Sequence, residues 1–134
     1  MFQVFVYGTL KPGGKYYKIF CQGKTLEEIK CWTKGRLFAL PVGYPAMIKG
    51  ENPIYGYLLS FASLNDLENL DNLEGYSGVP NSPLNEYDRI KVMVYDEKNQ
   101  PLGEVWTYIM TEDRVKTLGG VYLPSGEWMM KNEE

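Results

Sequence analysis

The chain begins with a strand-like segment that runs into a glycine-rich loop: Val4-Phe5-Val6-Tyr7-Gly8-Thr9-Leu10-Lys11-Pro12-Gly13-Gly14. Aromatic and β-branched residues dominate positions 2–7, and they favour a β-strand over residues 1–7. Pro12 and the two glycines after it end the strand. Because Gly8 has no Cβ, a ligand can approach the backbone closely there, and successive free amides in such a loop form a concavity for an anion. The alternative is an ordinary turn, which the spacing alone favours.

The clearest helix of the chain follows Ser63. Leucines recur at every third position from residue 64 to residue 73, which places them along one side of a helix. Ser63 is a favourable N-cap residue, and Asp66 supplies an acidic side chain in the first turn. Gly75 stands where a left-handed glycine commonly ends a helix. We therefore expect a helix between Ser63 and Gly75.

Glu74 has an unusual position at the end of this helix. It lies beside the leucine stripe and directly precedes Gly75. The carbonyl end of a helix disfavours an anion, and so does partial burial, so both effects raise the pKa of a carboxyl there. A raised pKa suits a general base. The alternative is a solvated glutamate at a helix end, which is the commoner case, and Glu68 and Asp71 are interpreted as plain surface charges.

The remaining segments read mainly as strands joined by turns. We expect strands over residues 29–40, 87–95 and 103–110, with a bulge or bend at Gly35. Residues 46–49 and 54–61 read as a hairpin, and residues 16–22 and 111–118 as short helices. The fold class is α+β, a small mixed, mostly antiparallel β-barrel or curved sheet with flanking helices, formed by one domain over residues 1–134.

The composition excludes several classes of active site. The 134 residues include no histidine, so a Ser-His-Asp or Cys-His nucleophile system is excluded, and so is a histidine zinc site. Any chemistry therefore depends on carboxylates, tyrosines, lysines, thiols or backbone amides. Fourteen Lys and Arg against 17 Asp and Glu give a formal net charge of −3, which does not favour nucleic-acid binding.

Neither a membrane span nor a signal peptide is expected, since the chain has no long apolar run and starts with a strand. Cys21 and Cys31 lack Cys-x-x-Cys spacing and have apolar neighbours. Two buried free thiols in a reducing cytoplasm are the favoured interpretation, with a disulfide as the alternative. We expect a cytoplasmic protein that needs no metal or cofactor.

Three further motifs are ambiguous when taken alone. Tyr44-Pro45 is either an aromatic wall beside a pocket or an extended entry to an edge strand. Arg89 is a partner for a carboxylate, either in a site or in a structural salt bridge. Near the end of the chain, residues 123–128 are expected to form a turn that holds Trp128 against the body of the protein.

Taken together and in order, these motifs resemble the γ-glutamylcyclotransferase-like family, in its AIG2-like branch. The resemblance spans nearly the whole chain and rests on four stretches: Val4-Phe5-Val6-Tyr7-Gly8-Thr9-Leu10, Gly43-Tyr44-Pro45-Ala46, Leu70-Asp71-Asn72-Leu73-Glu74-Gly75-Tyr76 and Tyr87-Asp88-Arg89. It implies a small β-barrel flanked by helices, with a cavity at one mouth and no metal or cofactor.

The resemblance also implies a reaction and a set of site residues. Enzymes of this family cyclise a γ-glutamyl group, releasing 5-oxoproline and a free amine or amino acid. By residue-by-residue correspondence, Glu74 is the catalytic acid and base, and Tyr7, Gly8, Thr9 and Leu10 hold the substrate. The expected partner is a small γ-glutamyl compound, whose leaving amine the sequence does not identify; nor does it give the oligomeric state.

Two other classes of function remain open at this stage. One is a non-catalytic module that senses a γ-glutamyl or amino-acid ligand in the same cavity. The other is a structural interaction domain, which the high aromatic content alone suggests. Tyr7, Tyr44, Tyr76 and Tyr122 are candidate pocket walls, although each taken alone is more typical of core packing.

Overall fold

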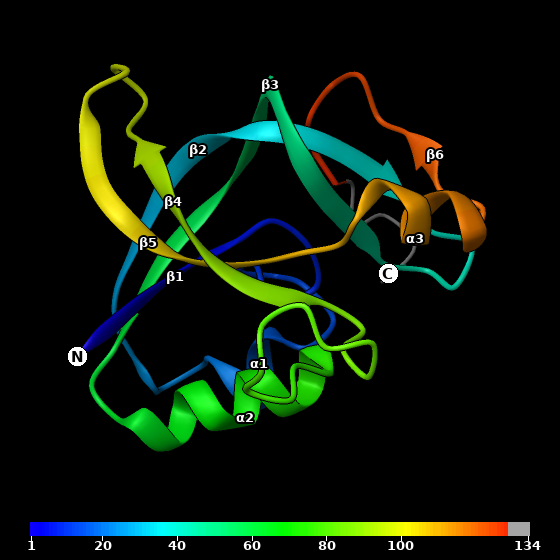
Figure 1. Cartoon of the computed structure of the whole chain (residues 1–134). Helices are drawn as coiled ribbons and strands as arrows, with labels where there is room; N and C mark the ends of the chain where they lie inside the picture. Colours follow the sequence, from blue (N-terminus) through cyan, green and yellow to red (C-terminus); the bar gives the residue numbers. More distant parts are fainter. Residues whose placement is uncertain (129–134) are drawn as a thin grey trace.

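The computed structural model describes residues 1–128, which form a curved sheet with helices packed against it (Figure 1). The elements, in chain order, are β1 (Phe2–Val6), α1 (Tyr17–Phe20), β2 (Thr25–Ala39), β3 (Pro45–Phe61), α2 (Leu64–Glu74), β4 (Asp88–Tyr95), β5 (Pro101–Ile109), α3 (Glu112–Thr117) and β6 (Val121–Tyr122).

The six strands form a partly closed barrel. Their order is β3-β1-β5-β4-β2-β6, and an additional pairing of β3 with β2 joins five of them into a ring. The β1–β5 pair is parallel and the other pairs are antiparallel. Closure is weak between β2 and β4, where Trp32 and Tyr95 are the paired residues. The predicted α+β class, with a mixed and mostly antiparallel barrel, is confirmed.

Strand β1 separates two hydrophobic clusters. Val4 and Val6 pack in a cluster that includes Leu70 of α2, whereas Phe5 packs with residues of β2 to β5 in a second cluster. This division follows from the alternation of side chains along a strand. Tyr7 continues the alternation and joins the cluster of Phe5. Both hydrophobic clusters therefore extend to the end of β1, next to the loop that follows it.

The predicted hairpin over residues 46–61 is wrong. These residues form the single long strand β3, and both of its halves pair with β2 in the antiparallel sense. The pairing skips a few residues of β3 between Gly35 and Arg36, which is the predicted irregularity at Gly35. A Cβ on Gly35 would lie 2.8 Å from Ile54 Cδ1 and 2.9 Å from Ile48 O. Residues 49–51, which include Gly50, therefore form a bulge next to this glycine, where the sequence suggested a turn.

Helix α2 has the predicted ends. Asn65 N–H donates to Ser63 Oγ at 3.2 Å, and Gly75 ends the helix with a φ of 69°. Figure 1 shows this helix running along one side of the sheet, next to α1. Leu70 is completely buried between helix and sheet, whereas Leu64 is 72% exposed and does not belong to the core. The leucine stripe thus anchors mainly the C-terminal half of the helix, where Glu74 lies.

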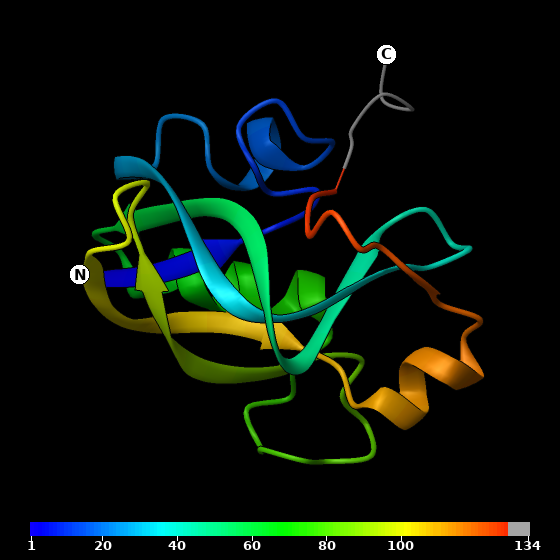
Figure 2. The ribbon, with the colours of Figure 1, turned by 90° about the horizontal axis from the view of Figure 1, so that it is seen from above.

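The segment after β6 lies beside β2 and β3 (Figure 2). Leu123 N–H donates to Leu37 O, and Tyr55 N–H donates to Gly126 O, each at 2.8 Å. Trp128 packs against the cluster of Phe5, as the sequence predicted. The rest of the predicted irregular tail, residues 129–134, lies outside the described residues.

Cys21 and Cys31 are buried free thiols, so the disulfide alternative is wrong. Burial raises the pKa of each thiol to about 12, which keeps both protonated at neutral pH. Among residues 1–128, no helix has the length and apolar character needed to cross a membrane.

The packing of α2 generates a stability prediction. Leu70→Ala removes a fully buried side chain and should lower the free energy of unfolding by about 2–5 kcal/mol. Leu64→Ala, on the same helix but exposed, is the matched control and should change it by less than about 0.5 kcal/mol. Urea unfolding of both variants measures the difference. Equal effects of the two substitutions would contradict this account of how the helix is anchored.

Candidate active site

One cavity lies where the end of β1, the end of α2 and the loops before β3 and β4 meet. Its volume of about 120 Å³ has room for several water molecules, and therefore for an amino-acid-sized group. The structure brings all five predicted site residues to this cavity: Tyr7, Gly8, Thr9, Leu10 and Glu74. Two segments about 65 positions apart in the sequence therefore share one site.

The loop after β1 offers backbone donors at the cavity. Its backbone hydrogen bonds run from Lys11 N–H to Gly8 O, at 3.0 Å, and from Tyr16 N–H to Thr9 O, at 2.9 Å. Within the described part of the chain, the amides of residues 8–10 donate to no protein acceptor. A Cβ on Gly8 would lie 2.6 Å from Pro45 Cγ, so only glycine fits at this position. The loop can therefore hold an anion or a developing oxyanion.

Glu74 contributes a carboxyl group that protein atoms leave without a hydrogen bond. It is half-buried, and no donor among residues 1–128 reaches it. Burial, and secondarily the negative charge of Glu86, raise the pKa of Glu74 to about 8. The sequence predicted this direction from the helix end and from partial burial, and the structure gives burial as the main cause and the charge of Glu86 as the second. A carboxyl with this pKa can accept a proton near neutral pH and return it.

The sequence did not identify Glu86 as a member of this site. Glu86 lines the cavity and accepts a hydrogen bond from Tyr44 OH through its Oε2. Its own N–H donates to Gly75 O at 3.0 Å, and the next N–H, of Tyr87, donates to Glu74 O at 3.2 Å. Glu86 follows an irregular loop with no periodicity, so nothing in the sequence indicated that this loop returns to the end of α2.

The tyrosines of the site act mainly as walls. Tyr7 OH donates to Tyr108 O at 2.7 Å and accepts from Met47 N–H at 3.2 Å, so the backbone occupies this hydroxyl. Tyr87 OH likewise donates to Pro45 O at 2.6 Å. Burial raises the pKa of both hydroxyls, so they stay neutral. Tyr44 also lines the cavity, in agreement with the interpretation of Tyr44-Pro45 as an aromatic wall.

Two of the four candidate wall tyrosines lie elsewhere. Tyr76 packs against the Arg89 guanidinium, with the ring centroid 5.2 Å from Cζ. Tyr122 pairs with Phe38 across β2 and β6 and accepts a hydrogen bond from the Asn52 amide. Both rings are used in packing away from the cavity, which is the role that the sequence favoured for each tyrosine taken alone.

One family model, described as gamma-glutamyl cyclotransferase, AIG2-like, matches residues 4–130 of the chain. The chain belongs to this family. A comparison with curated proteins gave no match.

Solved structures show the same fold. A protein of Arabidopsis thaliana, known from its solution structure, is 26% identical, with a TM-score of 0.65 over 98% of this chain and 79% of the other. YkqA of Bacillus subtilis is 24% identical with a TM-score of 0.65, and the match covers 94% of this chain but 39% of that longer one. A mouse AIG2-like protein is 21% identical, with a TM-score of 0.66 over 92% of this chain and 86% of the other.

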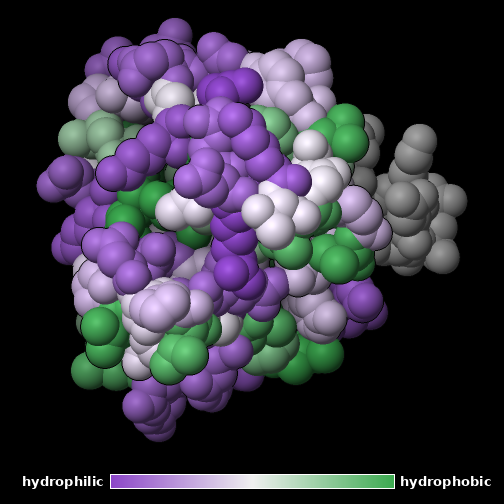
Figure 3. Space-filling view, turned by 45° about the vertical axis from the view of Figure 1, so that its right-hand side comes forward, coloured by the Kyte–Doolittle hydropathy of each residue, from purple (hydrophilic) through white to green (hydrophobic). Residues whose placement is uncertain are grey.

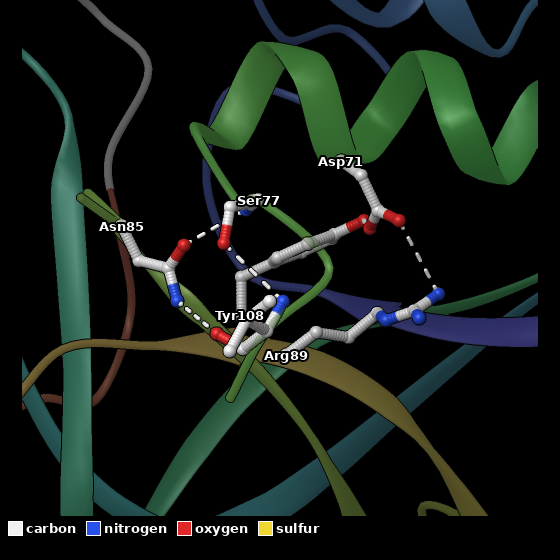
Figure 4. Close-up of polar contacts among 6 residues, drawn as sticks. Asp71, Ser77, Asn85, Arg89 and Tyr108 are labelled. Carbon is white, nitrogen blue, oxygen red and sulfur yellow. Dashed lines mark hydrogen bonds and ion pairs between the residues drawn. The ribbon is translucent and has the colours of Figure 1, made fainter. Parts of the chain in front are cut away.

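In this cyclotransferase-like chain, Asp71 supports the cavity wall (Figure 4). Tyr108 OH donates to Asp71 Oδ1 at 2.6 Å, and Arg89 Nη1 lies 3.5 Å from Asp71 Oδ2. Arg89 also lies over the Trp106 ring, 4.4 Å from its centroid. The interpretation of Asp71 as a plain surface charge is therefore wrong. Its carboxylate ties the wall residue Tyr108 to α2, and Arg89 is the structural partner of that carboxylate.

Asn85 closes the loop between α2 and β4, and Figure 4 shows its side chain hydrogen-bonded to Ser77. Asn85 Oδ1 accepts from Ser77 N–H at 2.8 Å, and its amide nitrogen donates to Asp88 Oδ1 at 2.8 Å. These bonds fix the backbone on either side of Glu86. Among the described residues, no group of three or more Cys, Asp or Glu side chains is placed to hold a metal ion.

The site geometry predicts how Glu86 affects Glu74. Glu86→Gln removes a negative charge that disfavours ionisation of Glu74, so the pKa of Glu74 should fall below about 8. Glu68→Gln, an exposed change on the same helix, is the control and should leave this pKa in place. Titration of the labelled Glu74 carboxyl by NMR measures both. An unchanged pKa in the Glu86 variant would contradict the electrostatic coupling.

Proposed function

We propose that this chain cyclises a γ-glutamyl compound to 5-oxoproline and releases an amine or amino acid, with Glu74 as the general acid and base. The observation that carries the proposal concerns the carboxyl of Glu74, which is half-buried and has no hydrogen-bond donor among residues 1–128. It lines the same cavity as residues 8–10, whose amides donate to no acceptor in that part of the chain. Membership of the γ-glutamyl cyclotransferase, AIG2-like family supports a reaction of this kind.

The reaction proceeds by intramolecular acyl transfer. Glu74 removes a proton from the substrate α-ammonium group, and the freed amine attacks the γ-carbonyl carbon to form a five-membered ring. The attacking nitrogen gives up a second proton as it becomes the amide nitrogen of the ring, and the bond between the γ-carbonyl carbon and the leaving nitrogen breaks. The leaving amine takes up both protons, the first of them returned by Glu74. The nucleophile and the carbonyl belong to one molecule. Holding the substrate in a folded conformation therefore lowers the activation barrier by several kcal/mol.

The loop of residues 8–10 has one of two roles in this scheme. Its free amides stabilise either the oxyanion that develops at the γ-carbonyl or the α-carboxylate of the substrate. Tyr7 lines the cavity, while its hydroxyl stays hydrogen-bonded to the backbone. No cofactor is required, since the nucleophile comes from the substrate and the acid and base from Glu74.

The buried free thiols of Cys21 and Cys31 favour a reducing compartment, and we place the reaction in the cytoplasm. The leaving amine belongs to one of four chemical classes. It is a free amino acid, a lysine side-chain amine, the cysteinylglycine of glutathione or a biosynthetic amine.

A second candidate function is a non-catalytic module that binds a γ-glutamyl or amino-acid ligand in the same cavity. The free amides of the loop would serve it equally well, but the raised pKa of Glu74 favours the enzyme, since binding alone does not need it. An interaction domain would be expected to present a broad apolar surface. On the face in Figure 3, hydrophobic residues lie in separate patches among hydrophilic ones.

Glu74→Gln tests the proposal, because it keeps the shape of the side chain and removes the acid and base. Against a panel of γ-glutamyl amino acids and amines, the variant should release 5-oxoproline at least about 100-fold more slowly than the unmodified chain. Glu68→Gln is the matched control and should retain full activity.

Full activity of the Glu74→Gln variant would overturn the role of Glu74. Saturable binding without turnover of any compound in the panel would support the binding module instead. Circular dichroism and thermal unfolding confirm that each variant is folded before its activity is compared.

A further inference from the structure

Glu86 supplies a second carboxylate at the cavity, and the proposed reaction assigns it no role. We propose that Glu86 binds the α-ammonium group of the γ-glutamyl substrate and presents it to Glu74. This inference rests on the proposed function, and it makes Glu86 a substrate-binding and specificity residue of the same site.

The charges of the cavity lead to this assignment. A γ-glutamyl group carries one carboxylate and one ammonium group, and both must leave water when it enters the cavity. Among the described residues that line the cavity, the charged side chains are Glu74 and Glu86, with no lysine or arginine. The substrate carboxylate therefore matches the free amides of residues 8–10, and its ammonium group matches the acidic side chains.

The two acids are not equivalent. Glu74 must take up the proton that the ammonium group gives away, so it ends that step neutral. Once Glu74 is neutral, it no longer attracts the substrate nitrogen electrostatically. A second carboxylate beside it keeps one negative charge next to the amine throughout the step, which holds the nitrogen in place while the proton moves.

The position of Glu86 suits this role. Its side chain lies over Gly75, the residue next to Glu74: a Cβ on Gly75 would be 2.9 Å from Glu86 Cβ and 3.5 Å from Glu86 Oε1. Both carboxyl groups therefore lie at the end of α2. Glycine is needed at position 75 for the positive φ of 69° and for this space.

The carboxylate of Glu86 is also held in one orientation. Tyr44 OH donates to Oε2, and the Tyr44 ring lies against the Tyr87 ring, with centroids 6.4 Å apart. Glu86 N–H donates to Gly75 O at 3.0 Å, which fixes the backbone. Tyr44 uses one of the two carboxylate oxygens, and Oε1, on the side of Gly75, is the one available to a substrate amine.

In the structural alternative, Glu86 serves only to anchor the loop before β4, by accepting the hydrogen bond from Tyr44. The two roles differ in one respect. If Glu86 only anchors the loop, its removal weakens the binding of every ligand alike. If Glu86 binds the ammonium group, its removal weakens the binding only of ligands that carry the amine.

Binding measurements with three probes separate these roles. The probes are γ-glutamyl ethylamide, glutaric acid monoethylamide, which lacks only the α-amine, and N-ethyl-4-aminobutanamide, which lacks only the α-carboxylate. Each is titrated calorimetrically at pH 7 into Glu74→Gln, which should not turn the first probe over, and into the double variant Glu74→Gln/Glu86→Gln.

With Glu86 present, removal of the α-amine should weaken binding at least tenfold; in the double variant it should weaken binding less than twofold. Removal of the α-carboxylate should weaken binding by the same factor in both proteins. This control confirms that the second substitution leaves the cavity intact. Adding Tyr44→Phe to Glu74→Gln removes the hydrogen bond to Glu86 but leaves the charge of Glu86 in place. The tighter binding of ligands with an α-amine should therefore persist in this variant.

An equal loss of affinity on removing the amine in both proteins would overturn the role of Glu86 and leave the proposed function standing. Failure of the unmodified chain to bind or turn over any γ-glutamyl compound would overturn the proposed function, and the role of Glu86 with it.

Discussion

Two backbone hydrogen bonds at the end of α2 hold the candidate site together. Glu86 N–H donates to Gly75 O, and Tyr87 N–H donates to Glu74 O. They bring the loop before β4 back to the helix end, and the left-handed conformation of Gly75 lets the chain turn there. Without them, Glu86 and Tyr87 would not reach the cavity. The arrangement of both carboxyl groups beside the loop after β1 depends on this closure.

The same closure determines the electrostatics of the site. It buries the carboxyl of Glu74 beside a like charge, which raises its pKa to about 8 from an ordinary value of 4.5. The folded state then holds this proton more tightly than the unfolded chain does. Stability is therefore lost progressively as the pH rises from about 4.5 to about 8. The raised pKa that suits Glu74 to the proposed proton transfer therefore weakens the fold at neutral pH.

Local sequence signals predicted much of this structure and missed what depends on long-range contacts. Ser63 and Gly75 fixed the helix ends because caps act within a few residues. The β3 hairpin was wrongly predicted because Gly50 and Pro53 resemble a turn, while the bulge depends on Gly35 in another strand. Asp71 and Glu86 acquire their partners, Tyr108 and Tyr44, only in the folded barrel. The resemblance to the family supplied Glu74 and the loop.

A crystal structure of the Glu74→Gln variant with an uncleaved γ-glutamyl compound tests the central claim most directly. The account predicts the ligand in the cavity, with its α-amine within hydrogen-bond distance of the side chain at position 74. Its γ-carbonyl oxygen or α-carboxylate should lie on the amides of residues 8–10. A ligand bound outside this cavity, or one whose amine points away from position 74, would contradict the account.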